Sequence, residues 1–183
     1  MNTEDRFTPA RPDCPYPQRW HSADSDSTEL EVSHLVAAFV RALQPNLVVE
    51  TGTAWGQTAE LIGQALKANG QGRLITLEPD PARAEHSRNR CAGLPVEVLQ
   101  QSSLDWAPDG PIDFAWFDSL FHLRPEELRH YRLDFSTRAV VGFHDTGPQH
   151  PVRNSLDGLV ADGLLEPPLF LPTPRGVAFA CPR

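Results

Sequence analysis

The feature that most constrains this chain is an alternation of short apolar runs with segments of helical periodicity. The predicted strands are five mainly apolar runs, at 47–49, 74–77, 96–99, 112–117 and 139–143. Such runs are typical of strands that are buried on both faces, and strands separated by helices pair in parallel. The sequence therefore predicts an α/β fold, a mainly parallel Rossmann-like sheet with helices on both faces.

Apolar residues recur at helical spacing between the predicted strands. Thr28 and Glu31 have the spacing of a capping box, which predicts that a helix begins there and ends before Pro45. Asp80 and Pro81 are a typical N-cap and first helical residue. The further helices expected cover about 57–67, 81–91, 152–161 and a segment that begins at Pro125.

The two ends of the chain complete the predicted organisation. Short runs at 169–171 and 177–180 flank a turn signal, which predicts a C-terminal β-hairpin that brings the sheet to seven strands, one of them antiparallel. Residues 1–27 are polar and proline-rich and are expected to form an irregular arm. Residues 28–183 are then expected to form a single domain.

Composition narrows the classes of partner and compartment. The net charge of −8 makes nucleic acid an unfavourable partner, and the cluster Arg83, Arg88 and Arg90 is most simply a solvated helix face. No run approaches the roughly 20 apolar residues of a membrane span, and the polar N-terminus has no signal-peptide core. We therefore expect a cytoplasmic protein without a membrane partner. The scattered cysteines fit free thiols.

Two features at strand ends indicate a nucleoside-containing cofactor. Gly52 and Gly56 follow the first strand and permit a tight turn before a helix, and Glu78 ends the second strand, where a carboxylate can accept both hydroxyls of a ribose. A dinucleotide loop requires G-x-G-x-x-G, but Thr51 stands where the first glycine should be. Glu50 would repel a pyrophosphate and suits an ammonium group, which favours S-adenosylmethionine over NAD.

These segments resemble the motifs of class I S-adenosylmethionine-dependent methyltransferases. Residues 48–56 resemble motif I in the E-x-G-x-x-x-G form common in small-molecule O-methyltransferases, and 112–118 and 140–146 resemble the motifs of strands four and five. The likeness covers roughly 30–182. The compact subgroup that includes cephalosporin-hydroxylase-like methyltransferases is most similar, although one extra residue separates Asp118 from His122. The cofactor-binding residues implied by the resemblance are Glu50, Thr51, Gly52, Thr53, Gly56, Glu78, Ser102, Ser103 and Asp118.

The resemblance leaves a divalent cation open. Several O-methyltransferases bind one through carboxylates after strands four and five, where Asp118 and Asp145 stand. Thr146 replaces the Asn that follows the second Asp in catechol-type enzymes, and His144 could complete the ligand set. At this point the sequence supports two alternatives about equally: a metal site at Asp118, His144 and Asp145, and a site without a metal.

The same resemblance also suggests catalytic residues. Catechol-type enzymes use a lysine base, but the single lysine, Lys67, is expected far from the site. His144 and His122 are then the candidate bases, because imidazole titrates near neutrality, and Asp118 is a third catalytic candidate.

The expected function is therefore O-methylation of a small hydroxylated molecule. The acceptor pocket is expected to come from the N-terminal arm and loops 119–124 and 145–153, with a neighbouring subunit of a homodimer as a further source. The alternatives are an NAD-dependent oxidoreductase and a non-catalytic nucleoside-binding protein of the same fold.

Overall fold

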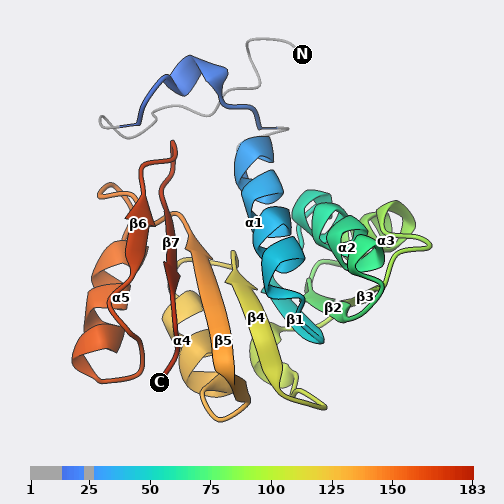
Figure 1. Cartoon of the computed structure of the whole chain (residues 1–183). Helices are drawn as coiled ribbons and strands as arrows, with labels where there is room; N and C mark the ends of the chain where they lie inside the picture. The colour runs from blue at the N-terminus through green and yellow to red at the C-terminus, as the bar shows by residue number, and fades with distance from the viewer. Residues whose placement is uncertain (1–13, 23–26) are drawn as a thin grey trace.

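The computed structural model describes residues 14–22 and 27–183, and these form a seven-stranded sheet with helices on both faces (Figure 1). The strand order is β3-β2-β1-β4-β5-β7-β6. The strands are β1 (Leu47–Thr51), β2 (Arg73–Leu77), β3 (Val96–Leu99), β4 (Ile112–Phe117), β5 (Phe135–His144), β6 (Leu169–Leu171) and β7 (Val177–Ala180). All pairs among β1 to β5 are parallel, and β7 is antiparallel to both of its neighbours. The predicted fold class and terminal hairpin are confirmed.

Two apolar cores separate the helices into two layers. The helices are α1 (Leu30–Leu43), α2 (Gln57–Asn69), α3 (Pro81–Arg90), α4 (Arg124–Tyr131) and α5 (Val152–Ala161), with short 3₁₀ turns at η2 (Pro17–Arg19) and η3 (Ser103–Asp105). One core joins α1 and α2 to side chains such as Val48 and Trp116, and the other joins α4 and α5 to Val49 and Phe117. Alternate residues of each strand thus face opposite helix layers, as expected for a sheet buried on both sides.

The start of α1 differs from the prediction. Glu29 is the N-cap residue, and no side chain caps the helix. The Thr28 hydroxyl donates a hydrogen bond to Asp118, and Glu31 accepts hydrogen bonds from the backbone and ring nitrogens of His21. The capping-box prediction was wrong because both side chains have partners outside the helix. The His21 contact ties the described part of the N-terminal segment to α1; the rest of the predicted arm, 1–13 and 23–26, lies outside the described residues.

Strand β5 is longer than its apolar run. The ladder with β4 passes from the pair Ile112–Phe135 to the pair Phe114–Val140, so the mostly polar segment 136–139 forms an irregularity in the register. Polar residues in such a bulge do not continue the apolar pattern, which is why the sequence predicted a later start. Within the described part of the chain, no helix has the length and apolar character needed to cross a membrane.

Two glycines provide a matched test of the packing. Gly142 lies buried in β5, where a Cβ would come within 2.7 Å of the Trp116 ring and 2.8 Å of the Phe179 ring. Gly158 is exposed in α5, and a Cβ there would meet nothing within 4 Å. We expect Gly142→Ala to lower the free energy of unfolding by about 1–3 kcal/mol through overpacking. Gly158→Ala should raise it by about 0.5–1 kcal/mol through helix propensity.

Chemical denaturation of both variants beside the parent protein measures the two effects. Equal stability of Gly142→Ala and the parent would show that the sheet tolerates the added methyl group, contrary to the packing described.

Candidate functional site

A cavity of about 530 Å³ opens at the carboxyl ends of the parallel strands. It lies where the chain order reverses, because β1 is followed outward by β2 and β3 on one side and by β4 and β5 on the other. Ligands of open α/β sheets bind at this position. The residues after β1, β2, β4 and β5 all contribute to the lining, as does Arg175 from the turn between β6 and β7.

The loop after β1 needs glycine for two reasons. Gly52 has φ +81°, and a Cβ on it would lie 2.5 Å from the carbonyl oxygen of Asp118. Gly56 has φ +77° and is the N-cap residue of α2. The close approach of the loops after β1 and β4 therefore depends on Gly52, and it brings the two loops to one side of the cavity.

Glu50 is a buried carboxylate that lines this cavity. Its side chain accepts from the Thr76 hydroxyl at 2.5 Å, and among the described residues no ion pair with a cation forms on it. Burial raises the pKa of Glu50 to about 8, although the hydrogen bond from Thr76 acts in the opposite direction; the charges of Asp118 and Glu78 raise it further. A buried carboxylate without a cationic partner is suited to receive a cationic group of a ligand.

Glu78 lies on the same cavity at the end of β2. Its two carboxylate oxygens accept from the backbone N–H of Ala54 at 2.8 Å and of Asp80 at 3.0 Å. These bonds fix the carboxylate against the Gly52 loop, and each oxygen keeps a second lone pair. The arrangement fits the predicted contact with ribose hydroxyls.

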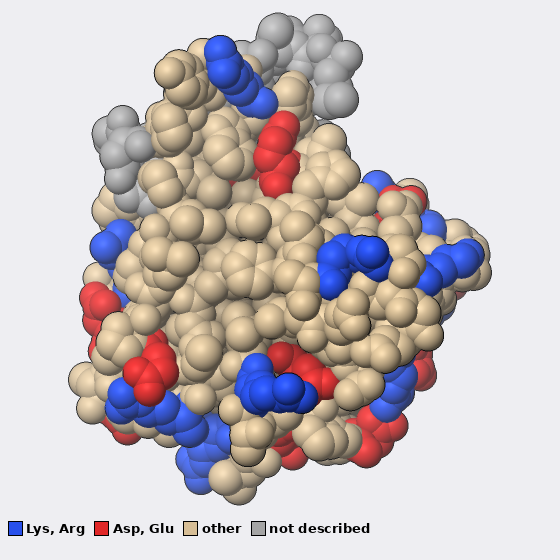
Figure 2. All heavy atoms as spheres, in the orientation of Figure 1, with Lys and Arg blue, Asp and Glu red and all other residues tan. Residues whose placement is uncertain are grey.

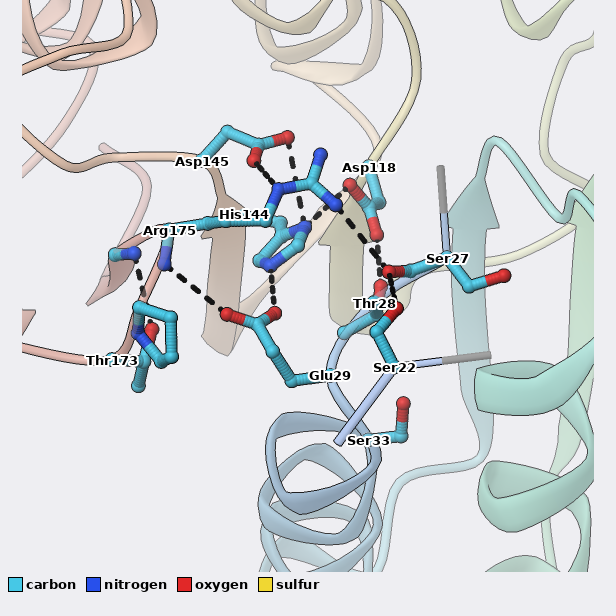
Figure 3. Close-up of polar contacts among 12 residues, drawn as sticks. Ser22, Ser27, Thr28, Glu29, Ser33, Asp118, His144, Asp145, Thr173 and Arg175 are labelled. Carbon is cyan, nitrogen blue, oxygen red and sulfur yellow. Dashed lines mark hydrogen bonds and ion pairs between the residues drawn. The ribbon is translucent and has the colours of Figure 1, made fainter. Parts of the chain in front are cut away.

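A chain of carboxylates and an imidazole crosses the ends of β4 and β5 (Figure 3). His144 Nε2 lies 2.5 Å from a carboxylate oxygen of Glu29, and Nδ1 lies 3.0 Å from Asp118. Burial would lower the pKa of His144, but the nearby charges of Asp118, Asp145 and Glu29 outweigh it and raise the pKa to about 10. Both ring nitrogens of the cationic imidazole therefore donate to carboxylates.

Two arginines complete this cluster. Arg124 is almost wholly buried and donates to Asp118 at 3.1 Å and to Asp145 at 2.8 Å. Arg175 donates to the other oxygen of Asp145 at 2.5 Å, as Figure 3 shows. Burial would raise the pKa of Asp145, but the charges of His144, Arg124 and Arg175 hold it well below its usual range. Asp145 itself has φ +55°, a conformation that Asp tolerates better than most residues.

The structure gathers most of the predicted cofactor residues on the cavity. The lining includes Glu50, Gly52, Thr53, Glu78, Ser102, Ser103 and Asp118. Thr51 and Gly56 are not part of it: Thr51 donates to the buried Glu127 of α4, and a Cβ on Gly56 would meet Ser87.

The predicted catalytic histidines are placed differently. His144 is fully buried behind Asp118 and does not line the cavity, and His122 is exposed outside it. Asp118 and Asp145 both line the cavity. Of the predicted acceptor loops, the segment 119–124 contributes most of its residues, whereas 145–153 contributes Asp145 alone.

Sequence reasoning missed three charged members of the site, Glu29, Arg124 and Arg175. Arg124 precedes Pro125 in the predicted helix start, and Arg175 stands in the predicted hairpin turn, so each occupied a position with an ordinary local explanation. The hairpin turn lies at the same sheet edge as the parallel strand ends because β7 runs antiparallel to β5. That geometry was the available signal for Arg175.

The atoms predicted to hold a metal do converge. One ligand atom each of Asp118, His144 and Asp145 lies within 4.8 Å of the others. One oxygen of each carboxylate contacts Arg124, and His144 Nδ1 lies near the same two oxygens, so these atoms already have partners within the protein. A cation at these residues stays a prediction, and the geometry gives it no open position.

Comparison with known proteins identifies both the sequence family and the fold. The profile of a family described as a methyltransferase domain matches residues 49–146. No curated protein matches the chain.

Solved structures that resemble this one include several methyltransferases. A Podospora anserina methyltransferase bound to S-adenosylhomocysteine has TM-score 0.74 and 16% identity, over 86% of this chain and 80% of that one. The O-methyltransferase TomG of tomaymycin synthesis from Streptomyces achromogenes has TM-score 0.71 and 22% identity, over 86% and 82%. An O-methyltransferase from Bacillus cereus has TM-score 0.73 and 18% identity, over 87% and 84%. At these identities the likeness establishes the fold.

The His144 cluster yields a prediction about stability. His144→Ala should lower the free energy of unfolding at neutral pH by roughly 3–5 kcal/mol, because Glu29 and Asp118 would lose a buried cationic partner. The pKa of His144 is raised from 6.5 to about 10, so its stabilisation is fully present below about pH 6.5 and is lost as pH rises through about 10. The deficit of the variant should shrink over that interval.

Denaturation at several pH values, with the exposed His34→Ala as a control, measures this dependence. A deficit that is the same at neutral pH and above pH 10 would contradict the described imidazolium.

Proposed function

The chain belongs to the methyltransferase domain family, and from this premise we propose that it transfers the methyl group of S-adenosylmethionine to an oxygen of a small hydroxylated molecule. The observation that carries the proposal is the placement of Glu50 and Glu78 on one cavity at the strand-order reversal. One carboxylate is suited to an ammonium group and the other to ribose hydroxyls, and S-adenosylmethionine contains both.

Lining residues that could contact each part of this cofactor support the proposal. Glu50 would hold the ammonium of the amino-acid part and Glu78 the ribose, while Ser102 and Ser103 line the cavity after β3, where related enzymes contact adenine. The bound cofactor supplies a methyl group on a sulfonium, which is already reactive. The task of the protein is then to orient the acceptor and to exclude water.

The acceptor side of the cavity is apolar at its rim and charged at its base. Leu120 and Phe121, from the loop after β4, line the cavity and remain partly exposed, with 64% and 37% of their surface accessible. Asp118 precedes them and lies deeper, 11% exposed. This arrangement supports an acceptor with an apolar body that rests on the rim and a hydroxyl that reaches Asp118.

Among the predicted catalytic residues, the geometry favours Asp118 for contact with the acceptor. A base needs a free lone pair within hydrogen-bond reach of the hydroxyl. Both nitrogens of His144 face carboxylates, and His122 lies outside the cavity lining. We propose that Asp118 orients the acceptor hydroxyl and that His144 acts by holding Asp118.

The surface supports a small-molecule acceptor. On the face in Figure 2 the charged side chains lie mainly around the periphery, with both signs interspersed and a largely uncharged centre. A continuous basic stripe, which would follow a phosphate backbone, is not visible among the described residues of this face. The net charge of −8 favours the same conclusion. A cytoplasmic location and a homodimer remain predictions.

Binding and turnover test the proposal together. Calorimetry should detect S-adenosylhomocysteine binding, and Glu78→Ala should weaken it by at least about tenfold, or 1.4 kcal/mol, through loss of charged hydrogen bonds to the ribose. Incubation with methyl-labelled cofactor and a panel of phenols and other hydroxylated compounds should then transfer label to oxygen.

Each alternative function has its own outcome in this experiment. Tight NAD binding without a response to S-adenosylhomocysteine would support the oxidoreductase. Cofactor binding without labelled product from any acceptor would favour the non-catalytic alternative. Glu97→Ala, an exposed change on β3, is the matched control and should leave the affinity unchanged.

Cofactor binding should also release a proton from Glu50. At about pH 6.5 a carboxyl with a pKa of about 8 is mostly protonated, whereas the ammonium of the ligand is already charged. The ammonium favours the ionised carboxylate, so about one proton should leave on binding, and affinity should rise as pH rises toward 8.

Calorimetry in two buffers of different ionisation enthalpy measures this release. The apparent enthalpies should differ for the parent protein and agree for Glu50→Gln, which has no proton to release. Equal enthalpies for the parent protein in both buffers would contradict the assigned role of Glu50.

A further inference from the structure

The carboxylates of Asp118 and Asp145, which follow β4 and β5, leave no unoccupied ligand position between them. One oxygen of Asp118 accepts from Arg124 Nη2 at 3.1 Å and from His144 Nδ1 at 3.0 Å, and the other accepts from the Thr28 hydroxyl. One oxygen of Asp145 accepts from the same Arg124 nitrogen at 2.8 Å, and the other accepts from Arg175 at 2.5 Å. All four oxygens therefore have a donor.

The Arg124 nitrogen lies between the two carboxylates, where a shared divalent cation would have to bind. Oxygen-liganded Mg²⁺ and Ca²⁺ require contacts of about 2.0–2.6 Å and about six or more ligands, whereas a guanidinium needs only the hydrogen-bond distances seen here. His144 cannot serve as the third ligand without a change, because its Nδ1 faces Asp118 and its Nε2 faces Glu29. A metal ligand must present a lone pair.

Arg124 is held in this position from several directions. Its Nε donates to the backbone oxygen of Ser119 at 2.8 Å, and Nη1 donates to the backbone oxygen of His144 at 2.5 Å. Only 3% of its side chain is exposed. Release of the guanidinium to admit an ion would break these bonds and leave a buried cation without partners, which is unfavourable.

Two permanent cations already face these carboxylates. Arg124 contacts Asp118 and Asp145, and Arg175 contacts Asp145. A divalent cation added to this buried site would be repelled by both guanidinium groups. Charge repulsion and donor occupancy thus lead to the same conclusion.

We propose that the guanidinium of Arg124 takes the place of the divalent cation between Asp118 and Asp145, so that this site works without a metal. Arg124 lines the cavity and is a permanent positive charge beside the acceptor position. The exclusion of metal concerns the cluster alone, whereas the role toward the acceptor rests on the proposed methyl transfer.

The test is a titration with Mn²⁺. Binding is measured as the decrease of the paramagnetic signal of the free ion. The parent protein should show no specific Mn²⁺ binding. Arg124→Ala should leave two carboxylates and a histidine without their central cation and should gain Mn²⁺ affinity by at least about tenfold. Arg124→Lys keeps a charge at the site and should not gain affinity, and Arg129→Ala, a partly exposed arginine of α4 paired with Glu126 and Asp162, should behave as the parent.

Three results would overturn the proposal. The first is binding of about one Mn²⁺ per parent chain, if Mg²⁺ displaces the ion and Asp145→Asn abolishes binding. The second is a folded Arg124→Ala variant that gains no Mn²⁺ affinity. The third is a gain of Mn²⁺ affinity in Arg124→Lys equal to that in Arg124→Ala. If Arg124→Ala does not fold, Arg124→Gln, which is neutral and closer in size, replaces it, and the parent titration still decides whether the native site takes a metal.

S-Adenosylhomocysteine titrations of the same parent samples, before and after chelation, separate this proposal from the proposed function. Equal cofactor affinity in both supports the metal-free site. Absence of cofactor binding in both contradicts the proposed function and leaves the Mn²⁺ result intact, whereas loss of binding on chelation, restored by Mg²⁺, contradicts the metal-free site.

Discussion

The interaction on which the rest of the site depends is the buried set of three carboxylates and three cations at the ends of β4 and β5. Its members come from the N-cap of α1, the ends of both strands, the start of α4 and the β6–β7 turn. Buried charges are tolerated when each is paired and hydrogen-bonded, and the pairing here joins segments that lie more than 100 residues apart. The cluster therefore fixes the start of α1 and the terminal hairpin against the central strands.

The cavity beside this cluster is lined by carboxylates of two kinds. Glu50 and Glu78 are carboxylates without cationic partners among the described residues, suited to a ligand that brings its own positive charge and hydroxyl groups. By contrast, Asp118 is held by Thr28, Arg124 and His144, so its orientation toward an acceptor does not depend on the ligand. Preorganised groups of this kind favour a reaction that requires alignment more than proton chemistry.

The sequence predicted those features that are encoded locally. Apolar runs predicted every strand. The glycine loop and the acidic strand ends predicted residues that line one cavity, because strand geometry brings residues that follow parallel strands to one edge. The charged cluster could not be predicted in the same way. Thr28 and Glu31 fit a capping box by spacing, yet their actual partners are Asp118 and His21. Glu29 and Arg175 depend on contacts with β5 and its loop that no local pattern records.

Replacement of an ion by a guanidinium changes what the site can do to an acceptor. A divalent cation polarises a bound hydroxyl more strongly than a single charge at hydrogen-bond distance, because Coulomb energy scales with charge and falls with distance. A site built on Arg124 therefore lowers the pKa of the acceptor hydroxyl less than a metal would. If the proposed methyl transfer holds, a phenol or enol, whose oxygen ionises more readily than that of an aliphatic alcohol, is the expected acceptor. Leu120 and Phe121 give the cavity an apolar rim, which suits the apolar ring of a phenol, so the proposed electrostatics and the apolar rim favour the same chemical class.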